Sequence, residues 1–235
     1  MSDLQTMRAV MRVWKNAQLP MTNVVRWGNF PAYGQILTEH NSSLPIVGQY
    51  VITLLRHHAP RFQFDTQLLY EAFALHDHGE PLTGGDEHAG AVTADKAVRE
   101  WKAFFGMVRE LPDPIRQRQL LAFTLQYVRK SCRNSLPADA FWVLNQIDGH
   151  YKNEAIIFEF CERLDYLFSA LDGYDRRVRN KEEGMLEHCY ANQAPKIGGL
   201  LIELPTLSHV WSSELREQLG QLAERDARGE YPKPA

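Results

Sequence analysis

Apolar residues at helical spacing are the feature that most constrains this chain. Their longest run follows Asn153, where the spacing alternates between three and four residues. That stripe consists of Ile156, Ile157, Phe160, Leu164, Leu167, Phe168 and Leu171, and Gly173 is expected to close the helix. No alternation typical of a β-strand extends beyond a few residues. The sequence therefore predicts an all-α protein.

Similar stripes predict a globule of roughly seven to nine helices. The others fall at residues 5–15, 44–55, 66–76, 97–108, 114–128, 135–147 and 215–222. Asp65, Thr93 and either Ser212 or Ser213 are expected to cap helices at their N-termini. Gly198 and Gly199 predict a break, and an apolar run at 200–204 follows them.

Pro45 allows two alternatives for the residue at which the helix at 44–55 begins. Pro45 is well tolerated in a first turn, but it would kink a helix that had already begun at Thr38. His40 lies just before this helix or within its first turn.

Size and charge set broad limits on function. The 235 residues suffice for one large domain, and their net charge of −3 gives no general attraction to nucleic acid or to an anionic membrane. Three cysteines, Cys132, Cys161 and Cys189, lie far apart without a CxxC pair. This argues against a disulfide framework or a cysteine zinc site and favours a reducing cytosol.

Neither a signal peptide nor a membrane span is expected. Arg8, Arg12 and Lys15 interrupt the apolar residues at the N-terminus. The most apolar run, 44–55, is too short to cross a bilayer. The sequence thus predicts a cytoplasmic protein.

The stretch 71–86 carries the densest group of chemically active side chains. It begins as an apolar helix, reaches His76 and Asp77, and breaks at Gly79. An imidazole beside a carboxylate suits Zn²⁺, Mn²⁺, Co²⁺ or Fe²⁺ better than Ca²⁺. Glu80 follows one helical turn after His76, close enough to act on a water molecule at such a metal. The stripe that ends at His76 points this imidazole toward the core.

With His40 and a late acidic residue, this stretch resembles the H…HD…D signature of HD-domain phosphohydrolases. Arg26-Trp27, Glu39-His40 and the segment 76–86 resemble, more narrowly, the bacterial 5′-deoxynucleotidase branch and related phage deoxynucleoside triphosphate hydrolases. The resemblance covers about residues 20–175. It implies an HD-domain core at 1–180 and a helical extension at 181–235 packed on it, with a tail disordered from about residue 229.

The resemblance also implies roles for individual residues. His40, His76 and Asp77 would hold a divalent metal, which could be Mn, Co, Zn, Fe or Mg, while Glu80 assists the water or the leaving oxygen. Arg26 would meet the phosphate, and the Trp27 indole would crowd the 2′ position of the sugar. Asp77 and Asp86 are also expected to line the substrate site.

Two features depart from the family pattern. The last metal ligand is Asp in the family, whereas the best match here is Glu162, and Asp165 and Asp148 remain alternatives. Glu159, Glu162 and Asp165 share one strip of their helix, which by itself is typical of a solvated face. An extra glycine, in Gly84-Gly85, shifts Asp86 by one position.

The implied activity is hydrolysis of a 2′-deoxynucleoside 5′-monophosphate to nucleoside and phosphate. A deoxynucleoside triphosphate triphosphohydrolase is the alternative, and it would need further cations, for which the candidates are Lys96, Arg99, Arg129, Lys130 and Arg133. A non-catalytic nucleotide-binding module is a third hypothesis. The acidic balance disfavours a nucleic-acid substrate. The partner is thus expected to be a small deoxynucleotide, without nucleic acid or membrane.

Relatives imply a dimer or a larger homo-oligomer in the cytoplasm, or in the host cytoplasm if a phage encodes the chain. An added stretch at 129–153 could form an interface or cover a base pocket. Five histidines, His57, His58, His150, His188 and His209, are expected at the surface or satisfied locally. His78 and His88 border the site.

Overall fold

A computed structural model describes residues 5–12, 21, 37–80, 83, 93–176 and 184–231. Within these ranges the chain forms helices and no strand, so the predicted all-α class is confirmed. The α-helices after the short one at 5–12 are α2 (Leu37–His58), α3 (Thr66–Leu75), α4 (Ala94–Val108), α5 (Asp113–Thr124), α6 (Phe141–His150), α7 (Lys152–Arg176), α8 (Met185–Glu203) and α9 (Ser213–Ala227). Short 3₁₀ helices span Leu125–Tyr127, Ser131–Ser135, Ala138–Ala140 and Pro205–His209. None of the helices in these ranges is long and apolar enough to cross a membrane.

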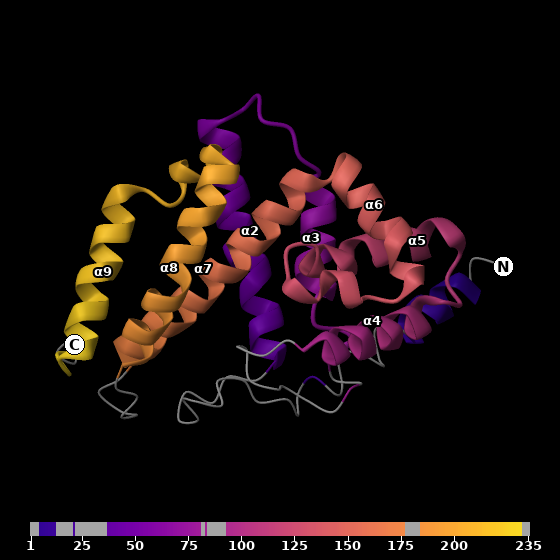
Figure 1. Ribbon diagram of the computed structural model, residues 1–235, viewed down its shortest axis with the longest axis horizontal. Coiled ribbons are helices and arrows are strands. Elements are labelled where there is room, and N and C mark those ends of the chain that lie inside the picture. Colours follow the sequence, from indigo (N-terminus) through magenta and orange to yellow (C-terminus); the bar gives the residue numbers. More distant parts are fainter. Residues whose placement is uncertain are drawn as a thin grey trace.

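Helix α7 lies at the centre of the packing. It contacts α2 and α3 on one side and α8 on the other, and α9 packs against α8 at the edge of the molecule (Figure 1). Helices α3 to α6 make up the other half, where α5 contacts α3, α4 and α6. One apolar cluster runs through both halves, from Leu44 on α2 to Ala223 on α9. The helices from α2 to α9 therefore share a single core.

Close packing of α2 on α3 places the two histidine-bearing helices together. Gly48 faces the ring of Phe73, and a Cβ atom at residue 48 would overlap that ring. Phe73 in turn stacks on Phe158 of α7, with ring centroids 5.7 Å apart. The absence of a side chain at Gly48 thus lets α2, α3 and α7 meet in one layer.

Local sequence signals explain where several helices begin. The side chains of Asp65, Thr93 and Ser212 each accept a hydrogen bond from the backbone N–H three residues further on. The predicted caps are therefore confirmed, with Ser212 rather than Ser213 at the last helix. Helix α2 begins at Leu37 and contains Pro45, so His40 lies inside the helix. The carbonyl of Asn41 then has no helical N–H partner at residue 45.

Two expectations about glycines were wrong. Helix α7 continues through Gly173 to Arg176, and α8 continues through Gly198 and Gly199. Buried Ile197 and Leu200 hold α8 in the core, and this packing outweighs the low helix propensity of glycine.

The residues directly after α9 fold back on the protein. The carbonyl of Glu230 accepts a hydrogen bond of 2.8 Å from Tyr174, and Tyr231 packs against the core. Residues 232–235 lie outside the described ranges, so the expected disorder from about residue 229 stays a prediction. The division at about residue 180 stays a prediction.

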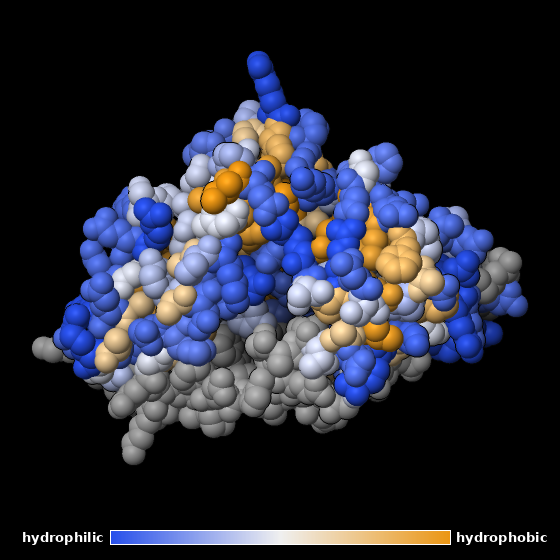
Figure 2. All heavy atoms as spheres, in the orientation of Figure 1, coloured by the Kyte–Doolittle hydropathy of each residue, from blue (hydrophilic) through white to orange (hydrophobic). Residues whose placement is uncertain are grey.

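The surface is mostly hydrophilic on the face shown in Figure 2, with apolar groups over the half that contains α5 and α6. The side chains of Phe141 and Trp142 on α6 are 44% and 36% exposed. The three cysteines are buried and form no disulfide, as expected.

A buried carboxylate on α9 caps the start of α8. Gly184 precedes α8 with a φ of 82° and offers no side chain as a cap. Instead, Asp226 accepts hydrogen bonds from the backbone N–H groups of Leu186 at 2.8 Å and Glu187 at 3.1 Å. Asp226 is 1% exposed. The last two helices are therefore joined by a cap as well as by apolar packing.

We predict that Asp226→Asn lowers the free energy of unfolding by about 1–2 kcal/mol, because an amide offers fewer acceptor sites to these buried N–H groups. Urea unfolding followed by circular dichroism measures the change. Asp95→Asn is the control, since this acid lies exposed in the first turn of α4. Equal stability of Asp226→Asn and the native chain would show that the cap contributes nothing.

Candidate metal centre

Two helices deliver the three residues of the candidate site. His40 lies in the first turns of α2, while His76 directly follows α3 and Asp77 continues into the turn beyond it. The buried stripe of α3, Leu68, Leu69, Ala72 and Phe73, carries the chain into the core immediately before His76. Both histidines are 2% exposed, whereas the Asp77 side chain is 13% exposed. The predicted inward direction of His76 is confirmed.

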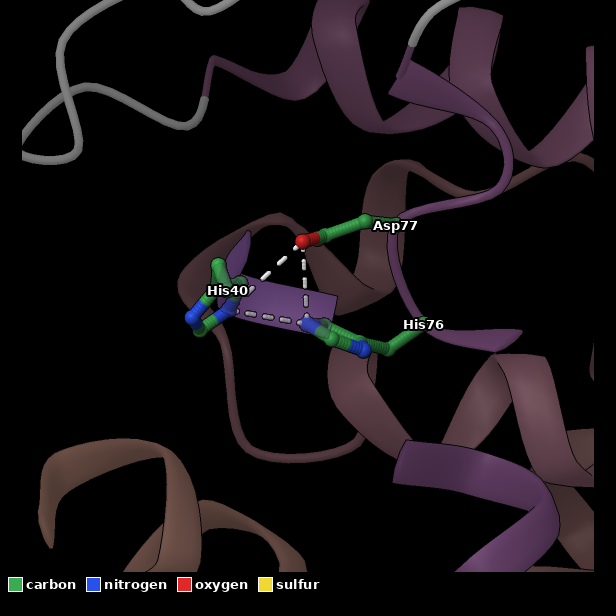
Figure 3. A group of neighbouring side chains, drawn as sticks. All are labelled: His40, His76 and Asp77. Atoms are coloured by element: carbon green, nitrogen blue, oxygen red, sulfur yellow. Dashed lines mark hydrogen bonds and ion pairs between the residues drawn. The ribbon is translucent and has the colours of Figure 1, made fainter. Parts of the chain in front are cut away.

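The donor atoms of these side chains converge on one point (Figure 3). The Nε2 atoms of His40 and His76 are 3.1 Å apart. Asp77 Oδ2 lies 3.0 Å from Nε2 of His76 and 3.5 Å from Nε2 of His40. Metal–ligand bonds of about 2.0–2.2 Å hold neighbouring ligand atoms about 3.0–3.5 Å apart. The triangle therefore has the size that one small divalent cation requires.

The other ring nitrogen of each histidine determines its tautomer. His76 Nδ1 lies 3.0 Å from the carbonyl oxygen of Phe73, and His40 Nδ1 lies 2.6 Å from Asp165 Oδ2. A carbonyl and an ionised carboxylate only accept hydrogen bonds, so each Nδ1 carries the proton. Both Nε2 atoms then direct lone pairs at each other and at the Asp77 carboxylate. The two Nε2 atoms and the Asp77 carboxylate thus face one another at short distances, an arrangement that a cation would stabilise.

The donor set fits a transition-metal ion. Two neutral imidazoles and one carboxylate are the usual ligands of Zn²⁺, Mn²⁺, Co²⁺ or Fe²⁺, and three protein ligands leave positions for water or substrate. The hydrogen bonds at Nδ1 are those by which metal-ligating histidines are commonly oriented. Among the described residues, His40, His76 and Asp77 form the group whose donor atoms lie close enough together to hold one ion.

The turn after α3 is held against α4 by a close backbone contact. A Cβ atom at Gly79 would lie 2.6 Å from the carbonyl oxygen of Glu100. Gln126 secures the same turn from the other side, because its side-chain amide donates to the carbonyl of His76. Glycine at residue 79 is therefore needed for Asp77 to reach the histidines.

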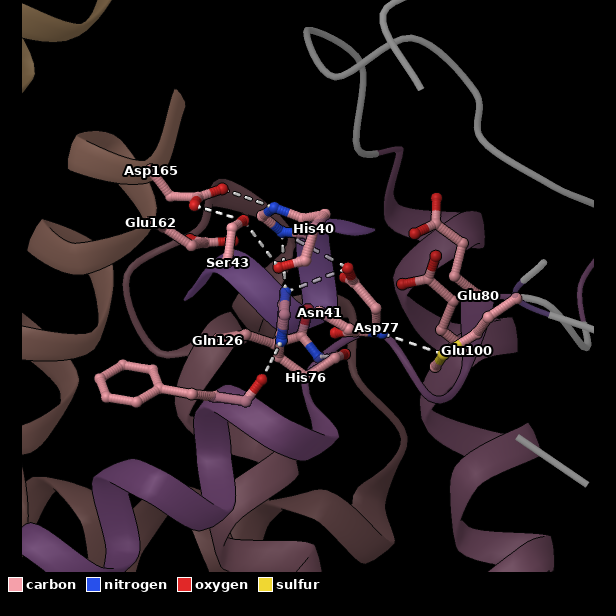
Figure 4. A network of polar contacts seen from close by, with 12 residues as sticks. His40, Asn41, Ser43, His76, Asp77, Glu80, Glu100, Gln126, Glu162 and Asp165 are labelled. Atoms are coloured by element: carbon pink, nitrogen blue, oxygen red, sulfur yellow. Dashed lines mark hydrogen bonds and ion pairs between the residues drawn. The ribbon is translucent and has the colours of Figure 1, made fainter. Parts of the chain in front are cut away.

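Glu80 belongs to a buried polar network beside the triad of His40, His76 and Asp77. Its Oε1 lies 2.9 Å from the ammonium of Lys96, which is also 3.6 Å from Glu100. Glu100 accepts a hydrogen bond of 2.8 Å from Tyr127, and burial raises the pKa of this carboxyl although Lys96 opposes the shift. Figure 4 shows Glu80 and Glu100 on the Asp77 side of the site. The role of Glu80 toward a water molecule stays a prediction.

Helix α7 brings two of the three candidate fourth ligands to the site. Glu162 is 8% exposed and lies 3.6 Å from the Lys130 ammonium. Burial alone would raise the pKa of Glu162, but Lys130, Arg163 and His76 outweigh it and lower the pKa. Asp165 bonds to the outer nitrogen of His40 instead of joining the triangle.

Asp148 is placed elsewhere, where it pairs with Arg133 in an exposed position. The structure thus brings Glu162 near the triad without adding it to the converging donors, and its ligand role stays a prediction.

The candidate cations separate into two groups. Lys96 and Lys130 reach the carboxylates around the triad. Arg129 pairs with Glu159 and Glu203, Arg133 pairs with Asp148, and Arg99 is exposed.

The remaining histidines differ in burial. His57, His58, His150, His188 and His209 are exposed, as expected. His78 is 4% exposed, and burial, followed by the neighbouring His76, lowers its pKa to about 4.

Several predicted substrate residues fall outside the described ranges. These are Arg26, Trp27 and Asp86, and His88, which was expected to border the site, lies outside the described ranges too. Sequence reasoning also missed partners of the site that the structure shows, namely Ser43, Gln126 and the outer position of Asp165. A signal existed for Ser43, which lies one turn after His40, but nothing in the spacing identified Gln126.

Comparison with known proteins returned no match to a family model, to a curated protein or to a solved structure.

We predict that Gly79→Ala weakens Mn²⁺ binding and lowers the free energy of unfolding by about 1–3 kcal/mol, because the new methyl group would displace the turn from α4. Gly106→Ala on α4 is the matched control, since a Cβ there meets no atom within 4 Å. Calorimetric titration with Mn²⁺ and urea unfolding provide the two measurements. Normal Mn²⁺ affinity in Gly79→Ala would show that the close approach does not position Asp77.

Proposed function

We propose that this chain is a divalent-metal-dependent phosphohydrolase that acts on 2′-deoxynucleotides. The observation that carries the proposal is the convergence of His40, His76 and Asp77, with both Nδ1 atoms engaged so that both Nε2 lone pairs face Asp77. The Asp77 side chain is 13% exposed whereas the histidines are buried, so a substrate would approach from the side of Asp77.

Charge around the triad supports an anionic substrate only when a metal is present. Among the described residues five carboxylates gather here, and the cations that act on them are Lys96, Lys130 and Arg163. The carboxylates are Asp77, Glu80, Glu100, Glu162 and Asp165. A bare phosphate would be repelled by this surplus of negative charge. A divalent cation offsets the surplus and gives the phosphate a positive partner.

The proposed reaction forms a bond between a water oxygen and phosphorus and breaks the bond from phosphorus to the 5′ oxygen. The proton released by water ends on the 5′ oxygen of the nucleoside. When bound, the metal supplies Lewis acidity that makes water acidic enough to react at neutral pH. Glu80 is assigned the transfer of this proton, since Lys96 holds its carboxylate beside the triad.

The choice of a deoxynucleotide rests on the sequence resemblance. Arg26 is assigned to the phosphate, Trp27 to the wall that excludes a 2′-hydroxyl, and Asp86 to the substrate side of the loop. A deoxynucleoside 5′-monophosphate is the first choice of substrate. The chain is further proposed to act in the cytoplasm as a homo-oligomer, without nucleic acid or a membrane as partner.

A deoxynucleoside triphosphate triphosphohydrolase is the second candidate. The observation that favours it is the pair of lysines, Lys96 beside Glu80 and Lys130 beside Glu162, which approach the triad from different elements. Either ammonium could exchange a carboxylate for the terminal phosphates of a longer substrate. The third hypothesis, from a different functional class, is a module that binds a nucleotide without catalysis.

The direct test is to incubate the purified full chain with Mn²⁺ or Co²⁺ and each deoxynucleoside mono- and triphosphate. Chromatography of the products separates the hypotheses. Nucleoside and phosphate from monophosphates support the first proposal, and nucleoside from triphosphates supports the second. Nucleotide binding without any product would favour the binding module.

We predict that His76→Gln abolishes turnover and Mn²⁺ binding together, because the remaining two donors hold the cation weakly. His57→Gln serves as the control, since this exposed histidine lies in the last turn of the same α2 that carries His40 at its start. Metal retention by titration and product formation are both measured. Full activity in His76→Gln would refute the metal centre.

We predict that Trp27→Ala raises activity toward ribonucleotides about tenfold relative to deoxynucleotides, because the wall at the 2′ position is removed. Trp142→Ala, at a surface tryptophan of α6, is the control. The ratio of kcat/KM for matched ribo- and deoxynucleotides is the measured quantity. An unchanged ratio would exclude Trp27 from sugar selection.

A further inference from the structure

The outward side of α6 carries two large aromatic residues. Phe141 and Trp142 are 44% and 36% exposed, and Figure 2 shows apolar groups over the half of the molecule that contains α6. The opposite side of the helix is buried in the core and consists of Val143, Leu144 and Ile147. The aromatic pair therefore lies on the side of α6 that the core does not use.

The same side of α6 carries aromatic and amide groups rather than charges. The α6 face consists of Phe141, Trp142, Asn145, Gln146 and Gly149. All five are exposed, and helical spacing places them on one side of the helix. Apart from His150, Asp148 is the one titratable residue of α6, and it forms an ion pair with Arg133. Aromatic enrichment and charge depletion distinguish the centre of a protein interface from the rest of a surface.

The two ends of α6 are complementary to each other in charge. Asp139 is exposed directly before the helix, and His150 is exposed in its last turn. A ten-residue helix is about 15 Å long, so two antiparallel copies bring Asp139 of each beside His150 of the other. An imidazole N–H can donate to a carboxylate in either protonation state. The dipoles of two antiparallel helices also attract each other.

We propose that the α6 face is the surface through which two copies of this chain associate, with their α6 helices antiparallel across a two-fold axis. At the axis, Asn145 of each copy meets Gln146 of the other, and each amide both donates and accepts. Trp142 of each copy covers Gly149 of the other. A Cβ atom at Gly149 would meet no atom within 4 Å outside the backbone of its own helix, so this end of the face has room for the indole.

The contact is small, and this sets its strength. Two helices of this length bury less surface than the roughly 1,200 Å² of stable complexes. We therefore expect a dissociation constant on the order of 100 µM. The inference gives the homo-oligomer of the proposed function one defined surface, but it does not depend on hydrolysis. It is tested on the full chain without metal or nucleotide, so failure of this interface and failure of the proposed function are separate results.

The first test is sedimentation equilibrium of the native chain from about 10 µM to about 1 mM. We expect the fraction of dimer to rise across this range. A monomer at every concentration would overturn the proposal and leave the α6 face to a different partner.

Gly149→Leu fills the room that the indole of the other copy would use. We expect association at least about tenfold weaker, with the fold retained, because the new side chain has open space in the monomer and leucine favours a helix. Gly106→Leu on α4 is the matched control, since a Cβ there also meets no atom within 4 Å. Circular dichroism checks the fold of both variants. Native association of Gly149→Leu would overturn the proposal.

A charge exchange tests the antiparallel arrangement independently of Gly149. His150→Glu sets two acids against each other at both ends of the interface, so we expect association about tenfold weaker. The double variant Asp139→Lys/His150→Glu places opposite charges there again and should restore association. Native association of His150→Glu, or failure of the double variant to restore it, would overturn the antiparallel interface.

Discussion

Helix α7 is covered by α2, α3, α6 and α8, yet it carries Glu162 and Asp165 into the interior. An ionised carboxylate that leaves water loses several kcal/mol of solvation unless charged or hydrogen-bonding partners replace the water. Lys130 faces Glu162, and His40 and Ser43 face Asp165. The apolar side of α7 fixes its depth in the core, and these acidic residues fix which segments must lie beside it.

The candidate centre combines two oriented histidines with an excess of negative charge among the described residues. Its histidines are oriented by groups behind them, and the carboxylates around them outnumber the ammonium groups. Binding of a cation would offset the negative charge of these carboxylates. The proposed metal would therefore stabilise the folded chain as well as enable the proposed hydrolysis. Stability and activity would then share one dependence on metal concentration.

Much of the fold followed from periodicity, because most helices bury one continuous apolar stripe. The caps at Asp65, Thr93 and Ser212 were also predictable, because a short polar side chain directly before such a stripe can accept a hydrogen bond from the first turn of the helix. Gly198 and Gly199 misled the prediction because packing on both sides of α8 outweighs local propensity.

The candidate site was predicted in part. His76 and Asp77 are adjacent in the sequence, and the resemblance supplied His40 as their partner. The hydrogen bonds to Asp165 and Gln126 could not be predicted, because they depend on the rotation of α7 and on the path of the chain after α5. Asp165 was weighed as a metal ligand, and in the structure its oxygens contact His40 Nδ1 and Ser43 Oγ.

The cap that Asp226 provides to α8 has a consequence for how the chain is made. A ribosome completes the start of α8 before it reaches Asp226, which follows Leu186 by 40 residues. Until α9 emerges, Asp226 cannot accept hydrogen bonds from the first N–H groups of α8, and the apolar side of α8 lacks its contacts with α9. The two helices therefore reach their final order together, only after α9 has been synthesised, and α9 completes the packing of α8.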